Sequence, residues 1–132
     1  SAVYLTWDYD AVAAASFDLG GVDASGFDTL SFRTVSRTHS WNSGVDAQDF
    51  GVRLTDGDGD SAEVNVADVQ VIPHLYSAYD EREVLQTVRV PFAQLAAANP
   101  DFDVDSLDLL ELYMSVDGGR GSILVTDIEL AE

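Results

Sequence analysis

Apolar and polar residues alternate with a period of two along much of the chain. The alternation is clearest in Phe50–Thr55, Ala62–Val66 and Leu85–Pro91. Successive side chains of a strand point to opposite faces, so this pattern predicts strands with one buried and one solvated face. The same reading adds five further strands: Val3–Trp7, Ala14–Leu19, Leu30–Val35, Leu109–Val116 and Ser122–Leu130. About eight such strands favour an all-β fold, an antiparallel two-sheet jelly-roll sandwich.

Turn residues separate the predicted strands. Turn-rich segments are Gly20-Gly21, Ser25-Gly26, Ser43-Gly44, Asp56–Asp60 and Asp117–Gly121. One short helix is predicted at Pro91–Ala98, with proline at its first position and Asn99-Pro100 ending it. Ile72–Glu83 lacks periodicity and is expected to be a loop. The mixed apolar runs at the two chain ends favour central positions in their sheets.

The length of 132 residues predicts a single domain, residues 1–132, large enough to bury a core. A hydrophobic fraction of 46% argues against disorder. No run approaches the roughly 18 apolar residues of a membrane span. Cysteine is absent, which excludes disulfides and thiolate metal sites. The chain enters a predicted strand almost at once, so we expect either a mature domain or a domain excised from a longer protein.

The excess of acidic residues limits the possible partners and adds a requirement for stability. Asp and Glu number 24 against six basic residues, all of them arginine, for a net charge of −18. Repulsion from phosphates makes nucleic acids and anionic membranes poor partners. The same charges repel one another, so the compact state needs screening by high salt or neutralisation by bound cations such as calcium.

Two C-terminal segments carry a resemblance. Leu85–Pro91 reads LQTVRVP and Gly121–Leu130 reads GSILVTDIEL. This order of strand, proline, helical turn and glycine-led final strand resembles the galactose-binding-like β-sandwiches that serve as carbohydrate-binding accessory modules of secreted bacterial hydrolases. Those domains commonly end on G-x-[apolar]-x-[apolar]-D-D-[apolar]; here Thr126 replaces the first aspartate and Asp127 keeps the second. The resemblance extends less sharply to Phe27–Val35 and Phe50–Asp56.

Two groups of aspartates are candidate calcium ligands. The resemblance implies a structural calcium held by Asp127 with N-terminal oxygens, for which Asp8 and Asp10 are the candidates. A carboxylate in an apolar strand otherwise needs an ion pair or hydrogen bonds, or it faces solvent at a strand end. Separately, Asp56, Asp58 and Asp60 alternate with glycines as in the first half of an EF-hand loop. Their flanks are strands and the second half departs from that motif, so a plain hairpin turn is the alternative.

Aromatic side chains outside the predicted core are candidates for sugar binding, because sugars stack on flat aromatic faces. Trp41 lies in a polar, glycine-bounded stretch beside Arg37, His39 and Asn42. Tyr76 and Tyr79 lie in the predicted loop with His74. Core packing at the open end of the sandwich is the competing role for these aromatics.

Catalytic chemistry has little support. There is no cysteine nucleophile and no G-x-S-x-G elbow. With 24 carboxylates some glycosidase-like pair is inevitable, so acid pairs carry no information. We therefore expect a non-catalytic, monomeric carbohydrate-binding module with structural calcium, appended to a secreted hydrolase and binding a polysaccharide or glycan. The alternative is a structural domain that packs on the hydrolase and binds no sugar.

Overall fold

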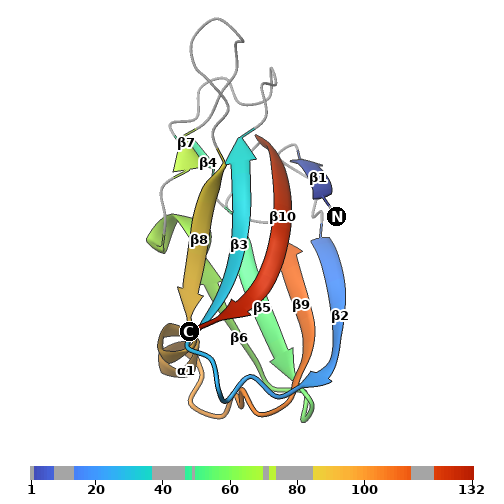
Figure 1. The fold of residues 1–132 in the computed structure, drawn as a ribbon, viewed down its shortest axis with the longest axis vertical. Helices are drawn as coiled ribbons and strands as arrows, with labels where there is room; N and C mark the ends of the chain where they lie inside the picture. The colour runs from blue at the N-terminus through green and yellow to red at the C-terminus, as the bar shows by residue number, and fades with distance from the viewer. Residues whose placement is uncertain are drawn as a thin grey trace, which may run out of the picture.

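The computed structural model describes residues 2–7, 14–36, 47–48, 50–69, 72–73, 85–113 and 121–132. Two four-stranded antiparallel sheets face each other (Figure 1). One sheet has the order β1-β10-β3-β8 and the other β2-β9-β5-β6. The strands of the first sheet are β1 (Ala2–Trp7), β10 (Gly121–Ala131), β3 (Thr29–Ser36) and β8 (Gln86–Pro91). Those of the second are β2 (Ala14–Val22), β9 (Leu107–Tyr113), β5 (Gly51–Asp56) and β6 (Ser61–Asn65).

The strand order is that of a jelly roll. Neighbouring strands in the sequence mostly belong to opposite sheets, and among the described strands β5 and β6 alone form a hairpin within one sheet. The first strand pairs with the last, from Ala2 opposite Thr126 to Trp7 opposite Gly121. The predicted fold class is therefore confirmed, and each of the eight predicted strands corresponds to one of these elements.

The core is the apolar layer between the sheets. Its members come from alternate positions of the strands, such as Val52 and Leu54 of β5 and Leu110 and Leu112 of β9, all fully buried. Phe32 of β3 and Phe50 beside β5 meet across the layer, with ring centroids 6.3 Å apart. The period-two pattern therefore identifies the buried face of these strands correctly.

The short helix α1 (Phe92–Ala98) lies beside β6 at one end of the sandwich (Figure 1). It begins one residue later than predicted, because Pro91 is its extended N-cap and the last residue of β8. Phe92 and Leu95 are buried, which fixes the helix against the core. Asn99 adopts extended backbone and ends the helix as predicted. Among the described residues no helix is long and apolar enough to cross a membrane.

Three details differ from the sequence prediction. β1 is an edge strand, not a central one, and its Tyr4 is 60% exposed. Within the predicted loop, Ile72–Pro73 forms β7, which pairs with β4 (Ala47–Gln48). Val66–Asp68, at the end of a predicted strand, forms the 3-10 turn η2.

The placement of Phe32 in the core is open to a direct test. We expect Phe32→Ala to lower the free energy of unfolding by about 3–5 kcal/mol, because it leaves a cavity between the sheets. Phe27→Ala is the matched control, and its loss should be smaller since Phe27 is already 38% exposed. Urea denaturation measures both, and equal losses would contradict the assignment.

Candidate functional site

The outer face of the β2-β9-β5-β6 sheet carries polar side chains in cross-strand rows. In one row Ser16, Glu111, Arg53 and Glu63 lie side by side on β2, β9, β5 and β6. The next row has Tyr113 of β9 opposite Gly51 of β5 and Ala14 of β2. An aromatic ring, a guanidinium and two carboxylates thus gather on one solvated sheet face.

The Tyr113 ring lies across the backbone of Gly51. A β-carbon at Gly51 would collide with the ring atoms Cε1 and Cζ, so the close approach requires glycine. On β5 the next outward residue is Arg53, whose guanidinium carbon lies over the Tyr113 ring, 4.6 Å from its centroid. A planar cation over an aromatic face is a favourable arrangement. The two planar groups are therefore stacked on the sheet, with the guanidinium over a face of the ring.

Arg53 is held by carboxylates from both neighbouring strands. Its Nε donates to Glu63 Oε2 at 3.1 Å, and its Nη1 lies 3.6 Å from Glu111 Oε1. Partial burial acts to lower the pKa of Arg53, but the bond to Glu63 and the charge of Glu111 outweigh it and raise this pKa. We call Gly51, Arg53, Glu63, Glu111 and Tyr113 together the Tyr113 platform.

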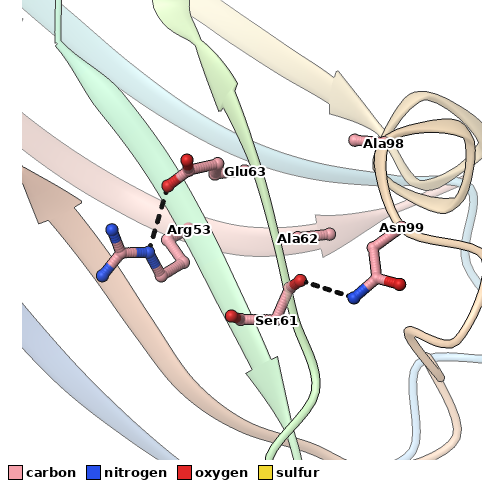
Figure 2. Close-up of a pocket in the computed structure, with 6 residues that line it drawn as sticks. All are labelled: Arg53, Ser61, Ala62, Glu63, Ala98 and Asn99. Atoms are coloured by element: carbon pink, nitrogen blue, oxygen red, sulfur yellow. Dashed lines mark hydrogen bonds and ion pairs between the residues drawn. The ribbon is translucent and has the colours of Figure 1, made fainter.

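A hollow continues from the platform between the strands and α1. One part, about 430 Å³, is lined by Arg53, Ser61, Ala62, Glu63, Ala98 and Asn99. Figure 2 shows this part, with Ala98 and Asn99 on the side of the helix and Arg53, Ser61 and Glu63 on the strands. The Asn99 amide donates to the Ser61 carbonyl at 2.8 Å and ties the end of α1 to β6.

A second part, about 330 Å³, is lined by Glu63, Val64, Asn65, Asp68, Gln94, Ala98 and Tyr113. The two parts share Glu63 and Ala98. We call them together the β6–α1 groove.

Asp56–Asp60 forms the hairpin turn between β5 and β6. Asp56 is only 2% exposed, and its carboxylate accepts backbone N–H bonds from Asp58, Asp60 and Asp103 at 2.9, 2.9 and 3.0 Å. Gly59 supplies the positive φ of the turn. Of the two alternatives left open by the sequence, the structure shows the hairpin turn.

The Asp56 carboxylate has few oxygens left for a calcium ion, and calcium binding at this turn stays a prediction. Asp56 turns inward and its oxygens are engaged by backbone donors, while the Asp58 side chain is exposed. Burial and the nearby charges of Asp56 and Asp101 raise the pKa of Asp60, so this carboxyl sits among like charges. Within the described residues no group of three or more His, Asp or Glu side chains is arranged to hold a metal ion.

Asp127 lies at an irregularity of β10. The register of β10 with β3 shifts between Thr126 and Glu129, and Asp127 takes a left-handed φ of 53°. Its side chain is 57% exposed, and its Oδ2 lies 3.7 Å from Arg33 Nη1. The carboxylate therefore faces solvent with an ion-pair partner and is not buried in an apolar run.

The strand register also bears on the proposed partners of Asp127. Trp7, which precedes Asp8, pairs with Gly121 at the other end of β10. Asp127 lies six positions after Gly121 along β10, or about 20 Å at roughly 3.3 Å per residue. Asp8 and Asp10 themselves lie outside the described residues, so calcium binding through Asp127 stays a prediction that this register does not favour.

The sugar-binding residues predicted from the sequence, Trp41, Arg37, His39, Asn42, Tyr76 and Tyr79, all lie outside the described residues. The strand ends that flank their segments are described. Ser36 pairs with Ile123 and Gln86 pairs with Thr34, at the end of the sandwich where β10 begins (Figure 1). Tyr113 ends β9, directly before the segment that leads to β10.

Sequence analysis missed Tyr113 although a signal was present. Leu110 and Leu112 are buried, so Glu111 and Tyr113 share the opposite, solvated phase of β9. An aromatic residue among the solvent-facing positions of a strand indicates an aromatic side chain on the outer surface of the sheet. Gly51 and Arg53 could not be assigned to it without the pairing of β5 with β9.

Solved structures resemble this fold closely. No protein-family model matches the chain, and no curated protein matches its sequence. A family 30 carbohydrate-binding module of a cellulosomal cellulase of Clostridium thermocellum superposes with a TM-score of 0.72 at 14% identity, over 99% of this chain and 74% of that one. Another family 30 module gives 0.71 at 14%, over 98% and 66%.

A family 11 carbohydrate-binding module from Clostridium thermocellum, in complex with a β-1,3-1,4-mixed-linked tetrasaccharide, gives a TM-score of 0.64 at 12% identity, over 99% of this chain and 82% of that one. The β-sandwich of carbohydrate-binding modules is thus the fold of this chain, as the resemblance implied. At these identities the likeness shows the fold alone.

The role of Asp56 can be tested by removing its carboxylate. We expect Asp56→Ala to lower the free energy of unfolding by about 3 kcal/mol, because three backbone donors lose their buried carboxylate acceptor. Urea denaturation should give the same loss in calcium and in EDTA. The exposed Asp58 offers the control Asp58→Ala, with little loss. A loss confined to calcium-containing buffer would show that Asp56 acts as a metal ligand.

The environment of Tyr113 predicts a dependence of stability on alkaline pH. Burial and the hydrogen bond to Glu63 raise the pKa of Tyr113 from 10.0 to about 12. The folded state therefore holds this proton more tightly than the unfolded chain. Its stabilisation is complete below pH 10 and is lost as the pH rises toward 12.

Urea denaturation of the wild type and Tyr113→Phe across this range should show the wild type losing stability relative to the variant. A constant difference between the two proteins would contradict the shifted pKa.

Proposed function

We propose that this chain is a non-catalytic carbohydrate-binding module that holds sugar rings on the Tyr113 platform. The observation that carries the proposal is the Arg53–Tyr113 stack, a planar guanidinium supported by an aromatic ring and flanked by Glu63 and Glu111, on the solvated face of a sandwich with this fold. The family 11 neighbour, whose fold this chain shares, is a module bound to a tetrasaccharide.

The platform supplies the two kinds of contact that a sugar requires. A pyranose ring has faces rich in C–H groups, which pack on a flat aromatic or guanidinium surface. Its hydroxyls donate to carboxylates and accept from guanidinium N–H groups. Glu63 and Glu111, on either side of Arg53, can accept hydrogen bonds from the sugar hydroxyls, and the Arg53 nitrogens can donate hydrogen bonds to them.

Three further parts of the proposal rest on the resemblance and on the charge of −18. They are a structural calcium, secretion, and attachment to a hydrolase domain. The modules with the same fold include one from a cellulosomal cellulase, and carbohydrate-binding modules are non-catalytic. Attached to an enzyme, such a module acts by raising local concentration on a polymer and not by chemistry.

Removing the aromatic ring tests the proposal. We expect wild-type protein to bind oligosaccharides from a panel that includes the mixed-linked tetrasaccharide, measured by titration calorimetry. Tyr113→Ala should weaken binding by about tenfold or more, since loss of a stacking surface costs about 1.4 kcal/mol. Gly51→Ala should weaken it too, because the added methyl group displaces the ring while leaving it in the chain.

Tyr4→Ala is the matched control. Tyr4 is an exposed tyrosine on β1 of the other sheet, so its loss should leave the affinity unchanged. Binding that survives Tyr113→Ala and fails in Tyr4→Ala would move the site to the other sheet. An absence of binding to every glycan in the panel would overturn the function itself.

A further inference from the structure

The β6–α1 groove extends away from Tyr113 along the edge strand of its sheet. Asn65 and Tyr113 line one part of the groove, Ser61 and Asn99 line the other, and Glu63 and Ala98 line both. Ser61 and Asn65 are four residues apart on one strand, or about 13 Å at roughly 3.3 Å per residue. The groove is therefore longer than a single sugar ring and runs parallel to β6.

Neutral polar residues are the largest group in the walls of the groove. Ser61 and Asn65 project from β6, and Gln94 and Asn99 project from α1 and its C-terminal cap. Hydroxyl and amide groups both donate and accept hydrogen bonds, which suits the vicinal hydroxyls of a carbohydrate. The Asn99 side chain is already fixed, since its amide bonds Ser61 and its oxygen accepts from the Asp101 N–H.

The charges in the groove disfavour an anionic ligand. Arg53 is the one cation in the two linings, and it is already paired with Glu63 and Glu111. Asp68 adds a further carboxylate at the Tyr113 end. A uronate or sulfate group placed here would meet more negative than positive charge.

We propose that the β6–α1 groove is an extended subsite that takes the units of an uncharged linear oligosaccharide beyond a disaccharide held at the Tyr113 platform. The inference rests on the proposed function, because the Tyr113 platform supplies the first contact. The chain of the ligand runs along β6, between the strand and α1. Ala98 stands where the two parts of the groove meet, so the small side chain at this position keeps the groove open.

The test blocks the groove and leaves the platform intact. A bulky side chain in Ala98→Trp fills the junction of the two parts. Ala93→Trp is the matched control, because Ala93 is exposed on the same helix, outside both linings, and about 100° from Gln94 around the helix. Gln94→Ala is a second variant that removes one amide without adding bulk. Thermal melts confirm that each variant is folded.

Calorimetry measures the affinity for a disaccharide, which tests the Tyr113 platform, and for the mixed-linked tetrasaccharide, which tests the platform and the groove together. Ala98→Trp should weaken tetrasaccharide binding by about tenfold, a loss of about 1.4 kcal/mol, and leave disaccharide binding unchanged. Gln94→Ala should give a smaller loss of the same kind, and Ala93→Trp none. An oligogalacturonide of equal length should bind more weakly than the neutral tetrasaccharide.

The outcomes separate the two proposals. If the wild type binds no sugar, the proposed function fails. If the wild type binds and Ala98→Trp keeps full affinity for the tetrasaccharide, the groove is not a subsite, while the function stands. Equal losses for the disaccharide and the tetrasaccharide would also overturn the subsite, because they would show damage to the platform. Tight binding of the oligogalacturonide would overturn the choice of an uncharged ligand.

Discussion

The apolar layer between the two sheets is the interaction on which the rest of the molecule depends. The chain has no cysteine and carries a net charge of −18, so burial must hold together a domain whose surface repels itself. Alternation along strands such as β6 and β9 makes this possible, because their buried Val and Leu side chains are followed by residues that point to water. Acidic side chains occupy the outer phase, where water screens them.

Asp56 is an exception to this outward placement of acidic side chains, because it is buried. Its carboxylate is buried, and it accepts bonds from the β5–β6 turn and from Asp103 in the segment before β9. One charged acceptor thus closes a hairpin and ties it to a distant segment. The same hairpin presents Arg53 and Glu63 on its outer face, so the turn helps to position the platform.

The strands could be predicted from the sequence because burial of one face produces a local alternation of apolar and polar residues with a period of two. The edge position of β1 could not be predicted, since an apolar run in the sequence does not show which strands will pair with it. The pairing of β4 with β7 was missed because two-residue strands have no period to detect. At Asp127 the irregularity in β10 turns the carboxylate to solvent; aspartate tolerates a left-handed φ better than most residues, but GSILVTDIEL contains no glycine at this position to predict one.

The candidate site could be predicted only in part, because the local sequence does not show which strands pair. Tyr113 stands on the polar phase of its strand, which sequence alone records, but its neighbours come from strands far away in the chain. Once register brings them together, Gly51 gives the ring its place and two glutamates hold the guanidinium above it. Side chains fixed in this way lose little further entropy when a ligand arrives. Under the proposed function, this rigid polar platform holds uncharged sugars on a surface whose overall charge attracts only cations.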